Sequence, residues 1–477
     1  MKFSVYTYYL LILSIFTGIV LMKDLMLGGE FVYFLIINIV VLKLAKGIYK
    51  VPVFFFLGTI FLSYFLRGFV IYFDFSSFTM YKVYPVSKEI SLKIFDDVLI
   101  AVSLFSIGYL IASVKYSKYR KKGLDNNYSQ AFLSSFGTIM LLLTGLLVLK
   151  LGLYYGLGIG RKGFENNGSV GFLLRLIPLD LPFVISVLFA FKYFDRLSIG
   201  QKMVLLVLTF GFSYSVLITG SKSFLMIFAV AYLVYLLYSG QKIGLLAFSI
   251  LLLIGVVLTG FSFAISRAMK YSFVFKDFTT IDIINLSLKI LKEEGLPEIL
   301  KNVTIRFNGF DGQLKYFGMV DSFNELHLHR LEQIFSIKEI GLRIVEGVVP
   351  KLELTSTVTC GRGVGMYAEG VPASKIYAGA LGILASVALM GKGALYGLMF
   401  FLGIFVGYVF KLIGYIKNPD LKFIFFFFFI FFTMNLAMSG NFDALLIQLI
   451  IKLAVLVFGV FLVFFVKSTL LKSPKGI

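Results

Sequence analysis

The chain has 477 residues, of which 59% are hydrophobic and only 15% are charged. This composition excludes an ordinary soluble protein, because charged residues make up about a quarter of a typical globular domain. The net charge of +20 does not indicate nucleic-acid binding. The long hydrophilic stretch 266–375 is nearly neutral, with 14 Lys or Arg and 13 Asp or Glu, so the excess positive charge lies in and between apolar segments. A single cysteine, Cys360, excludes an internal disulfide framework, and two histidines without a Cys/His cluster argue against a zinc site.

Apolar segments long enough to cross a bilayer recur along the chain, since a transmembrane helix needs about 20 such residues. Before the hydrophilic stretch the candidate spans are 4–22, 28–45, 51–72, 95–114, 130–151, 170–191, 203–219, 223–239 and 243–265. After it they are 376–390, 393–411, 421–438 and 443–466. The first segment has one preceding Lys and no small-residue cleavage site after it, so we expect a retained span and not a removed signal peptide.

The distribution of Lys and Arg decides whether all thirteen candidates cross. With a cytoplasmic N-terminus and a non-crossing 376–390 segment, the cytoplasmic loops and termini hold 19 Lys or Arg, and the short outer loops hold 8. If 376–390 crosses, the counts become 14 and 13, which removes the bias that the positive-inside rule describes. The segment is also short and rich in Gly and Ala, and non-spanning backbone at membrane depth is tolerated where it lines a protein cavity. We therefore predict twelve spans, a re-entrant or interfacial helix at 376–390, and two cytoplasmic termini.

The predicted fold is an all-α polytopic membrane protein. Residues 1–265 form transmembrane helices one to nine, and 266–375 form a large extracytoplasmic segment. Apolar residues at three- and four-residue spacing in 281–303 and 328–349 predict that this segment is mainly helical. Residues 393–477 then supply the last three spans and the cytoplasmic C-terminus.

Ionisable residues within spans are costly in hydrocarbon and are therefore candidates for function. Arg67 lies near the outer end of the third span, Arg175 and Asp180 lie in the sixth, and Lys452 lies in the last. Pairing between helices is the alternative for each of them. For Arg67 a further alternative is that the side chain extends to the membrane surface.

More cations lie in short Gly-containing segments or at a span end on the predicted outer side. Arginine and lysine in such an arrangement suit a phosphate or pyrophosphate group, through forked hydrogen bonds and point charge. The alternative is that each is an ordinary solvated side chain. These cations are Arg161, Lys222, Arg267, Arg306 and Arg362.

Three residues are candidates for a general base. Glu369 and Asp311 lie on predicted loops beside Gly or small residues, where reactive groups often occur, although each also suits a solvated acid. His327 is two residues from His329, and side chains two apart on a helix face different sides, so a shared metal is not expected. No D-x-D, G-x-S-x-G, P-loop or H-E-x-x-H motif occurs in a supporting context.

The chain resembles the O-antigen polymerase family. The resemblance rests on about twelve predicted spans, the long outer segment, the turn Gly220–Ser223, the Arg-x-x-Gly-x-Asp element of Arg306, Gly309 and Asp311, and the acid- and Gly-rich stretch 367–411. That family in turn resembles the lipid-dependent membrane glycosyltransferases, with a GT-C-like architecture.

The resemblance implies a metal-independent glycosyltransferase without a cofactor, acting on the periplasmic side of the bacterial inner membrane. In such a reaction a growing glycan leaves its undecaprenyl-pyrophosphate carrier and joins the terminal sugar of a new lipid-linked repeat unit. A chain-length-regulating copolymerase is the expected protein partner. The departing pyrophosphate needs electrostatic stabilisation and the attacking hydroxyl needs a base. We expect Arg267, Arg306, Lys222 and Arg161 in the first role, helped by Arg175, Arg67 or Arg362, and Glu369, Asp311 or His327 in the second.

Two other functions fit the same pattern. An O-antigen ligase uses the same donor with a different acceptor, and acceptor choice depends on pocket shape. A lipid-linked oligosaccharide flippase also needs a cationic cavity. Against the flippase stand the long outer segment and the absence of a visible two-half repeat in the sequence.

Overall fold

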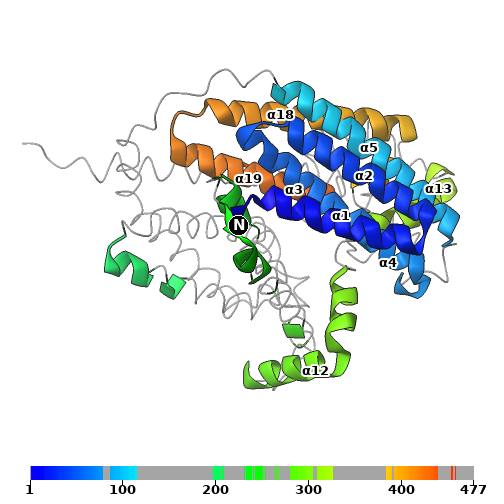
Figure 1. The fold of residues 1–477 in the computed structure, drawn as a ribbon, viewed down its shortest axis with the longest axis horizontal. Helices are drawn as coiled ribbons and strands as arrows, with labels where there is room; N and C mark the ends of the chain where they lie inside the picture. Colours follow the sequence, from blue (N-terminus) through cyan, green and yellow to red (C-terminus); the bar gives the residue numbers. More distant parts are fainter. Residues whose placement is uncertain are drawn as a thin grey trace, which may run out of the picture.

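The structure is a computed structural model that describes residues 2–78, 86–114, 197–204, 206–208, 230, 232–238, 240, 242–250, 253, 264–265, 268, 280–304, 309–325, 383–388, 391–438, 453–454 and 457. These residues are mostly helical, and the helices α1, α2, α3, α5, α18 and α19 lie side by side as a bundle (Figure 1). Five helical segments are long and apolar enough to span a membrane: Val5–Lys23, Leu25–Leu44, Gly47–Phe73, Lys88–Ser113 and Lys392–Tyr415. The chain is therefore a multi-pass, all-α membrane protein, as the composition predicts. The full number of spans stays a prediction, because several candidates lie outside the described residues.

The first two spans, α1 (Val5–Lys23) and α2 (Leu25–Leu44), form an antiparallel pair. Only Asp24 separates them, and its side chain caps α2 by accepting a hydrogen bond of 3.1 Å from the Leu27 backbone N–H. Towards the other end of the pair, the Tyr9 hydroxyl donates to the Asn38 side-chain oxygen over 2.9 Å. These polar contacts fix two helices whose surfaces are otherwise almost entirely apolar.

The third span contains a π-helical turn. It runs from α3 (Lys50–Ile60) through η2 (Phe61–Leu66, the π-helix) into α4 (Arg67–Phe73) without a break. A π-turn widens the helix locally, which changes the direction in which the following side chains face, and such turns are frequent at functional sites. Arg67 is the first residue after it.

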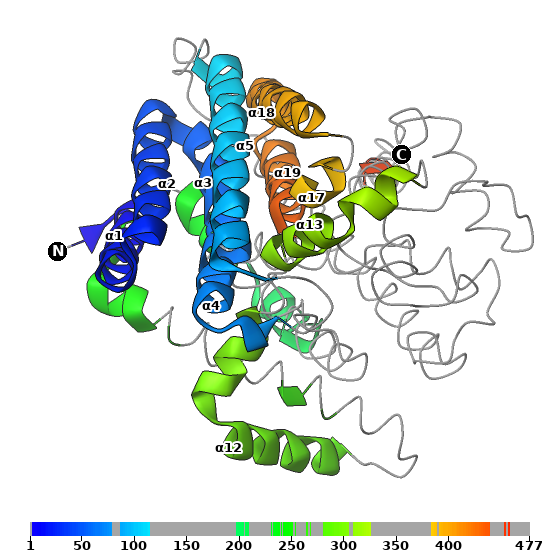
Figure 2. The ribbon, with the colours of Figure 1, turned by 90° about the vertical axis from the view of Figure 1, so that its right-hand side faces the viewer.

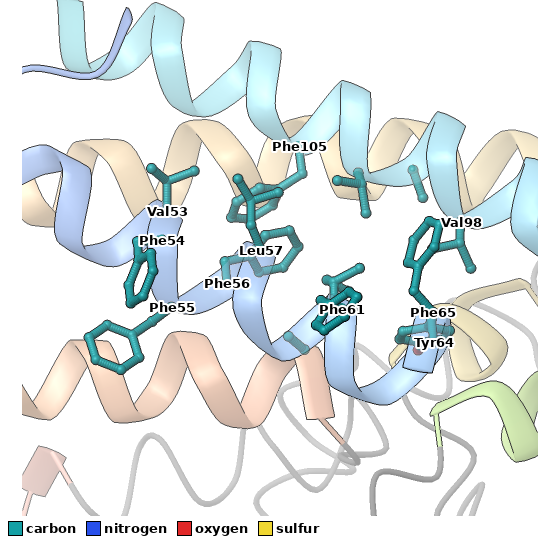
Figure 3. Packing of buried hydrophobic residues seen from close by; sticks show 14 of the residues in the cluster. Val53, Phe54, Phe55, Phe56, Leu57, Phe61, Tyr64, Phe65, Val98 and Phe105 are labelled. Atoms are coloured by element: carbon teal, nitrogen blue, oxygen red, sulfur yellow. The ribbon is translucent and has the colours of Figure 1, made fainter. Parts of the chain in front are cut away.

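Phenylalanine supplies much of the core between the third and fourth spans. Figure 3 shows Phe56 of α3 and Phe65 of η2 directed towards α5 (Lys88–Val114), whereas Phe55 points away from it. Phe56 and Phe105 stack with ring centroids 3.7 Å apart. On the other side of α3 lies α19 (Pro419–Met438), which also packs on α18 through an edge contact of Phe426 with Phe410. Edge-on ring pairs such as Phe410 with Phe426 stabilise a contact beyond the apolar area that they bury.

The helices α5 and α18 (Lys392–Tyr415) run parallel, with their backbones in close contact. Asp97 pairs with Lys392 near one end of this contact, and Gly407 lies against Ala112 near the other. A Cβ on Gly403 would lie 2.0 Å from the Phe105 carbonyl oxygen, so only glycine fits there. Small residues serve this purpose in membrane helix pairs generally. Two spans separated by five others cross the membrane in the same direction. The parallel arrangement is therefore the one required if five spans lie between these two helices and 376–390 does not cross.

The two ends of the bundle differ in charge. At one end, the short strand β1 (Lys2–Phe3) pairs with β2 (Ile243–Gly244). The Tyr109 hydroxyl of α5 donates to the Tyr49 carbonyl at the same end. The N-terminus, the loop before α3 and the C-terminal ends of α5 and α18 therefore lie together there. We call this the lysine end, and its lysines are Lys2, Lys43, Lys46, Lys50, Lys242, Lys411, Lys417 and Lys422. We call the opposite end the mixed-charge end, and its charged residues include Lys23, Asp24, Glu30, Arg67, Lys88, Asp96, Asp97, Asp311 and Lys392.

Two helices of the predicted extracytoplasmic segment are described. Helix α13 (Gly309–Glu325) lies across the mixed-charge end, where it contacts η2, α4, α5 and the short helix α17 (Ile383–Ala388), as Figure 2 shows. Helix α12 (Thr280–Thr304) lies away from the bundle and approaches it at its C-terminal end (Figure 2). Helix α17 is the described part of the segment 376–390, and the re-entrant course of that segment stays a prediction.

Candidate functional site

The candidate site begins where α13 meets α4. Two glycines allow the close approach: a Cβ on Gly309 would lie 2.6 Å from the Tyr64 ring, and one on Gly68 would lie 2.7 Å from the Phe310 ring. This contact brings Asp311, in the first turn of α13, beside Arg67, the first residue of α4.

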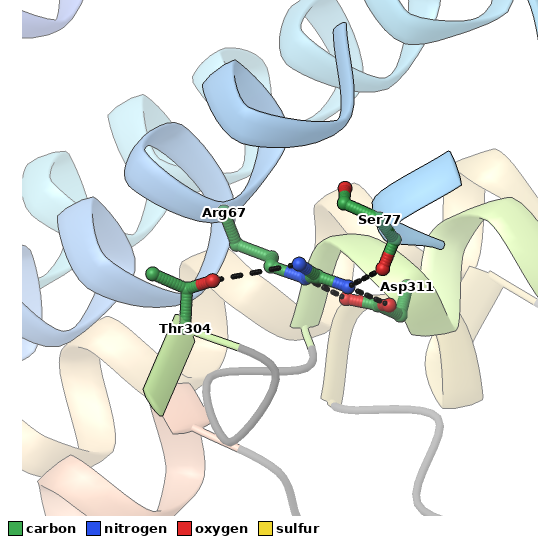
Figure 4. Close-up of polar contacts among 4 residues, drawn as sticks. All are labelled: Arg67, Ser77, Thr304 and Asp311. Carbon is green, nitrogen blue, oxygen red and sulfur yellow. Dashed lines mark hydrogen bonds and ion pairs between the residues drawn. The ribbon is translucent and has the colours of Figure 1, made fainter. Parts of the chain in front are cut away.

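Arg67 and Asp311 form a forked, buried ion pair (Figure 4). The Arg67 Nε and Nη2 atoms each donate to one carboxylate oxygen of Asp311 over 2.8 Å. Nη2 also donates to the Ser77 carbonyl over 2.9 Å, and Nη1 donates to the Thr304 hydroxyl over 3.4 Å. The Arg67 side chain is 0% exposed and that of Asp311 is 12% exposed. Paired guanidinium–carboxylate hydrogen bonds of this kind are among the stronger ones in proteins, and they also fix geometry.

This pair decides between the alternatives for Arg67. The side chain does not extend to the surface, because it is fully buried and bonded to helices distant in sequence. It joins α4 to α12, to α13 and to η3 (Phe75–Ser77), so it attaches the large hydrophilic segment to the transmembrane bundle. One predicted pyrophosphate ligand and one predicted base thus contact each other. Either would reach a substrate only if the pair opened.

The other predicted site residues lie outside the described residues. These are Arg161, Arg175, Lys222, Arg267, Arg306, His327, Arg362 and Glu369. Asp180 and Lys452 lie outside them as well. Their predicted roles stay predictions.

A second polar cluster joins α5 to α18 and was not found from the sequence. Lys392 Nζ lies 3.0 Å from Asp97 Oδ1, and the Tyr396 hydroxyl donates to the same oxygen over 2.8 Å. Asp97 is 6% exposed, whereas the Lys392 side chain is 53% exposed. Tyr316 of α13 lies nearby: its burial, and then the Asp97 charge, raise the pKa of this phenol. Helix α13 therefore reaches both clusters, with Asp311 at Arg67 and Tyr316 near Asp97.

A third cluster fixes the turn between α1 and α2. Asp24 accepts a hydrogen bond of 2.8 Å from the Tyr72 hydroxyl and lies 3.6 Å from Lys88 Nζ. Burial alone would raise the pKa of Asp24, but the hydrogen bonds from Tyr72 and Leu27 and the Lys88 charge together hold it below its ordinary value. The Lys88 ammonium also lies over the Tyr72 ring, 5.0 Å from its centroid. This cluster connects α1, α2, α4 and α5 at the same end.

The mixed-charge end thus combines carboxylates, phenols and amines against an apolar bundle. Within the described part of the chain, no group of three or more His, Cys, Asp or Glu side chains is placed to hold a metal ion. Comparison with known proteins adds no family: no family model, no curated protein and no solved structure matches the chain. The class that fold and site define is a multi-pass, all-α membrane protein with buried polar clusters at one end.

Proposed function

We propose that this protein is a glycan polymerase of the O-antigen polymerase type, which joins undecaprenyl-pyrophosphate-linked repeat units on the periplasmic side of the bacterial inner membrane. The supporting observation is the buried Arg67–Asp311 pair, which fixes part of the hydrophilic segment to the mixed-charge end of the bundle. A lipid-linked substrate needs a site of this kind, where an apolar bundle meets a polar segment, because the carrier stays in the bilayer while its sugars lie outside.

The charge difference between the two ends supports the orientation. Lys and Arg accumulate in cytoplasmic loops, so the lysine end is the cytoplasmic one. The mixed-charge end, with α13, α17 and Lys392, then faces the periplasm. This orientation agrees with the twelve-span topology predicted from the sequence, with 376–390 re-entrant.

The proposed reaction has one transfer step. A hydroxyl oxygen of the incoming repeat unit attacks the anomeric carbon of the growing chain, the bond from that carbon to the pyrophosphate oxygen breaks, and the hydroxyl proton passes to a base. Arg267, Arg306, Lys222 and Arg161 stabilise the departing pyrophosphate, with Arg175 and Arg362 as further cations, and Glu369 or His327 takes the proton. In the paired state Arg67 and Asp311 position α13. No metal or other cofactor is needed for this step.

Gene deletion distinguishes a polymerase from a ligase, and chain lengthening distinguishes a polymerase from a flippase. If the gene is deleted, loss of a polymerase leaves single capped repeats on the cell surface, whereas loss of a ligase leaves long lipid-linked chains in the membrane. A flippase moves lipid-linked repeats without lengthening them.

The direct test is elongation by purified protein in liposomes. We expect lipid-linked repeat units supplied on both membrane faces, without an ion gradient, to be converted into longer lipid-linked chains. We expect Arg306→Ala, at unchanged protein level, to lose this activity. Unchanged repeat units with the folded wild-type protein would exclude the polymerase.

A further inference from the structure

One side of helix α12 packs on the segment that precedes it in the chain. Ile290 is buried against Ala264 and Ala268, and Ile283 packs on the same cluster. Ala264 belongs to the last turn of the predicted span 243–265, and Ala268 lies one turn further along. The first part of α12 therefore lies at the level where that span is predicted to leave the hydrocarbon.

A second apolar side of α12 is exposed. Ile281, Ile284 and Leu288 are spaced by three and four residues, so they form one stripe along the helix. Their exposed fractions are 69%, 44% and 51%. The remaining side is polar, where Lys289 and Glu293 form an ion pair of 3.7 Å with both side chains mostly exposed. A helix with a charged side and a wide apolar side is typical of the membrane–water interface.

The other end of α12 is attached to the bundle. Its last residue, Thr304, accepts a hydrogen bond of 3.4 Å from Nη1 of Arg67, which lies near the end of the span Gly47–Phe73. Figure 2 shows that α12 bends between its first part and the part that reaches the bundle. Gly295 and Pro297 lie within the helix, and helices commonly bend at such residues. Contacts with one described span and one predicted span thus hold α12 beside the bilayer.

We propose that the first part of α12 lies in the membrane interface, with Ile281, Ile284 and Leu288 inserted among the lipid acyl chains of the leaflet next to the mixed-charge end. Three large aliphatic side chains on one stripe need an apolar partner. The bilayer supplies it, because the described spans expose side chains of the same kind, such as Leu25 and Phe401, at 77% and 66%. This inference goes beyond the proposed function and does not depend on the reaction.

Fluorescence quenching of the full-length protein in nanodiscs of phosphatidylethanolamine and phosphatidylglycerol tests this placement. Ile284→Cys and Leu288→Cys, each in a Cys360→Ser background, carry a bimane label on the exposed stripe. Lys289→Cys is the matched control, because it places the label on the polar side of the same helix turn. We expect a lipid with a nitroxide on its upper acyl chain to quench the labels at 284 and 288 several-fold more strongly than the label at 289. Aqueous iodide should quench the three labels in the opposite order.

Two results would overturn the placement. Strong iodide quenching of the labels at 284 and 288, without quenching by the nitroxide lipid, would show that the stripe faces water. Protection of both labels from both quenchers would show that protein covers the stripe. If either variant does not fold, Ile281→Cys takes its place on the same stripe, with the same expected result. Failure of the purified protein to elongate repeat units would exclude the polymerase and leave this placement intact.

Discussion

Replacing Asp311 by Asn is expected to destabilise the protein strongly and to abolish polymer synthesis. The change leaves the fully buried Arg67 guanidinium without its counter-charge. Removing one partner of a buried ion pair typically costs about 3–5 kcal/mol, because the remaining charge is not solvated. We expect Arg67→Met to have a comparable effect, since it leaves the Asp311 carboxylate in the same site. The readout is the temperature at which a fluorescent-protein fusion loses its monodisperse elution peak in detergent.

The double variant Arg67→Met/Asp311→Leu distinguishes a positioning role from a chemical one. Apolar replacement of both members of a buried pair is often neutral, so most of the lost thermal stability should return. If the pair only positions α13, polymer synthesis returns with it. A double variant that is stable but inactive would contradict the positioning role and would assign substrate contact to Arg67 or Asp311. Lys93→Met, which breaks the exposed Lys93–Glu89 pair on α5, is the control and should leave the transition unchanged.

Replacing Gly403 by Ala is expected to separate α5 from α18. The new Cβ would lie 2.0 Å from the Phe105 carbonyl oxygen, which is backbone and cannot move independently of its helix. Overpacking in a close-packed interior costs about 1–3 kcal/mol, and backbone clashes belong at the upper end of that range. Because the displacement also moves Lys392 and Tyr396 relative to Asp97, it weakens their contacts with that carboxylate, and we expect a lower thermal transition.

Gly397→Ala is the matched control for this prediction. Gly397 lies on the same helix, and a Cβ there would meet nothing within 4 Å. Alanine also has the higher helix propensity, so the control should be at least as stable as the wild type. A Gly403→Ala protein with wild-type stability would show that the two helices are not in the close contact described.

Hydropathy predicted the described spans well, but their ends less well. The candidate spans 4–22 and 28–45 correspond to Val5–Lys23 and Leu25–Leu44. The fourth candidate, 95–114, begins seven residues after the helix does, at Lys88. The predicted span stops short of Lys88, Glu89 and Lys93, whereas the helix continues through these charged residues to reach the polar end of the bundle.

The two ion pairs could not be predicted from the sequence. Arg67 is recognisable as a buried or interfacial charge, but its partner lies 244 residues away. Lys392 is 295 residues from Asp97, and the adjacent Asp96 and Asp97 suggest only the end of a span. Such contacts depend on how α13 and α18 pack on the bundle, and local periodicity does not contain that information. The close packing at Gly309 and Gly403 is likewise determined by neighbours that are distant in sequence.

We expect the end of the bundle with the Arg67–Asp311 and Asp97–Lys392 pairs to face the periplasm. This orientation is tested by membrane-impermeant maleimide labelling of two single-cysteine proteins in a Cys360→Ser background. The two are Gly393→Cys at the mixed-charge end and Lys417→Cys at the lysine end, both at exposed positions. We expect Gly393→Cys to be labelled in right-side-out inner-membrane vesicles, and Lys417→Cys to be labelled only after the membrane is permeabilised. Labelling of Lys417→Cys from outside, with Gly393→Cys protected until permeabilisation, would place the site in the cytoplasm, where periplasmic polymerisation cannot occur.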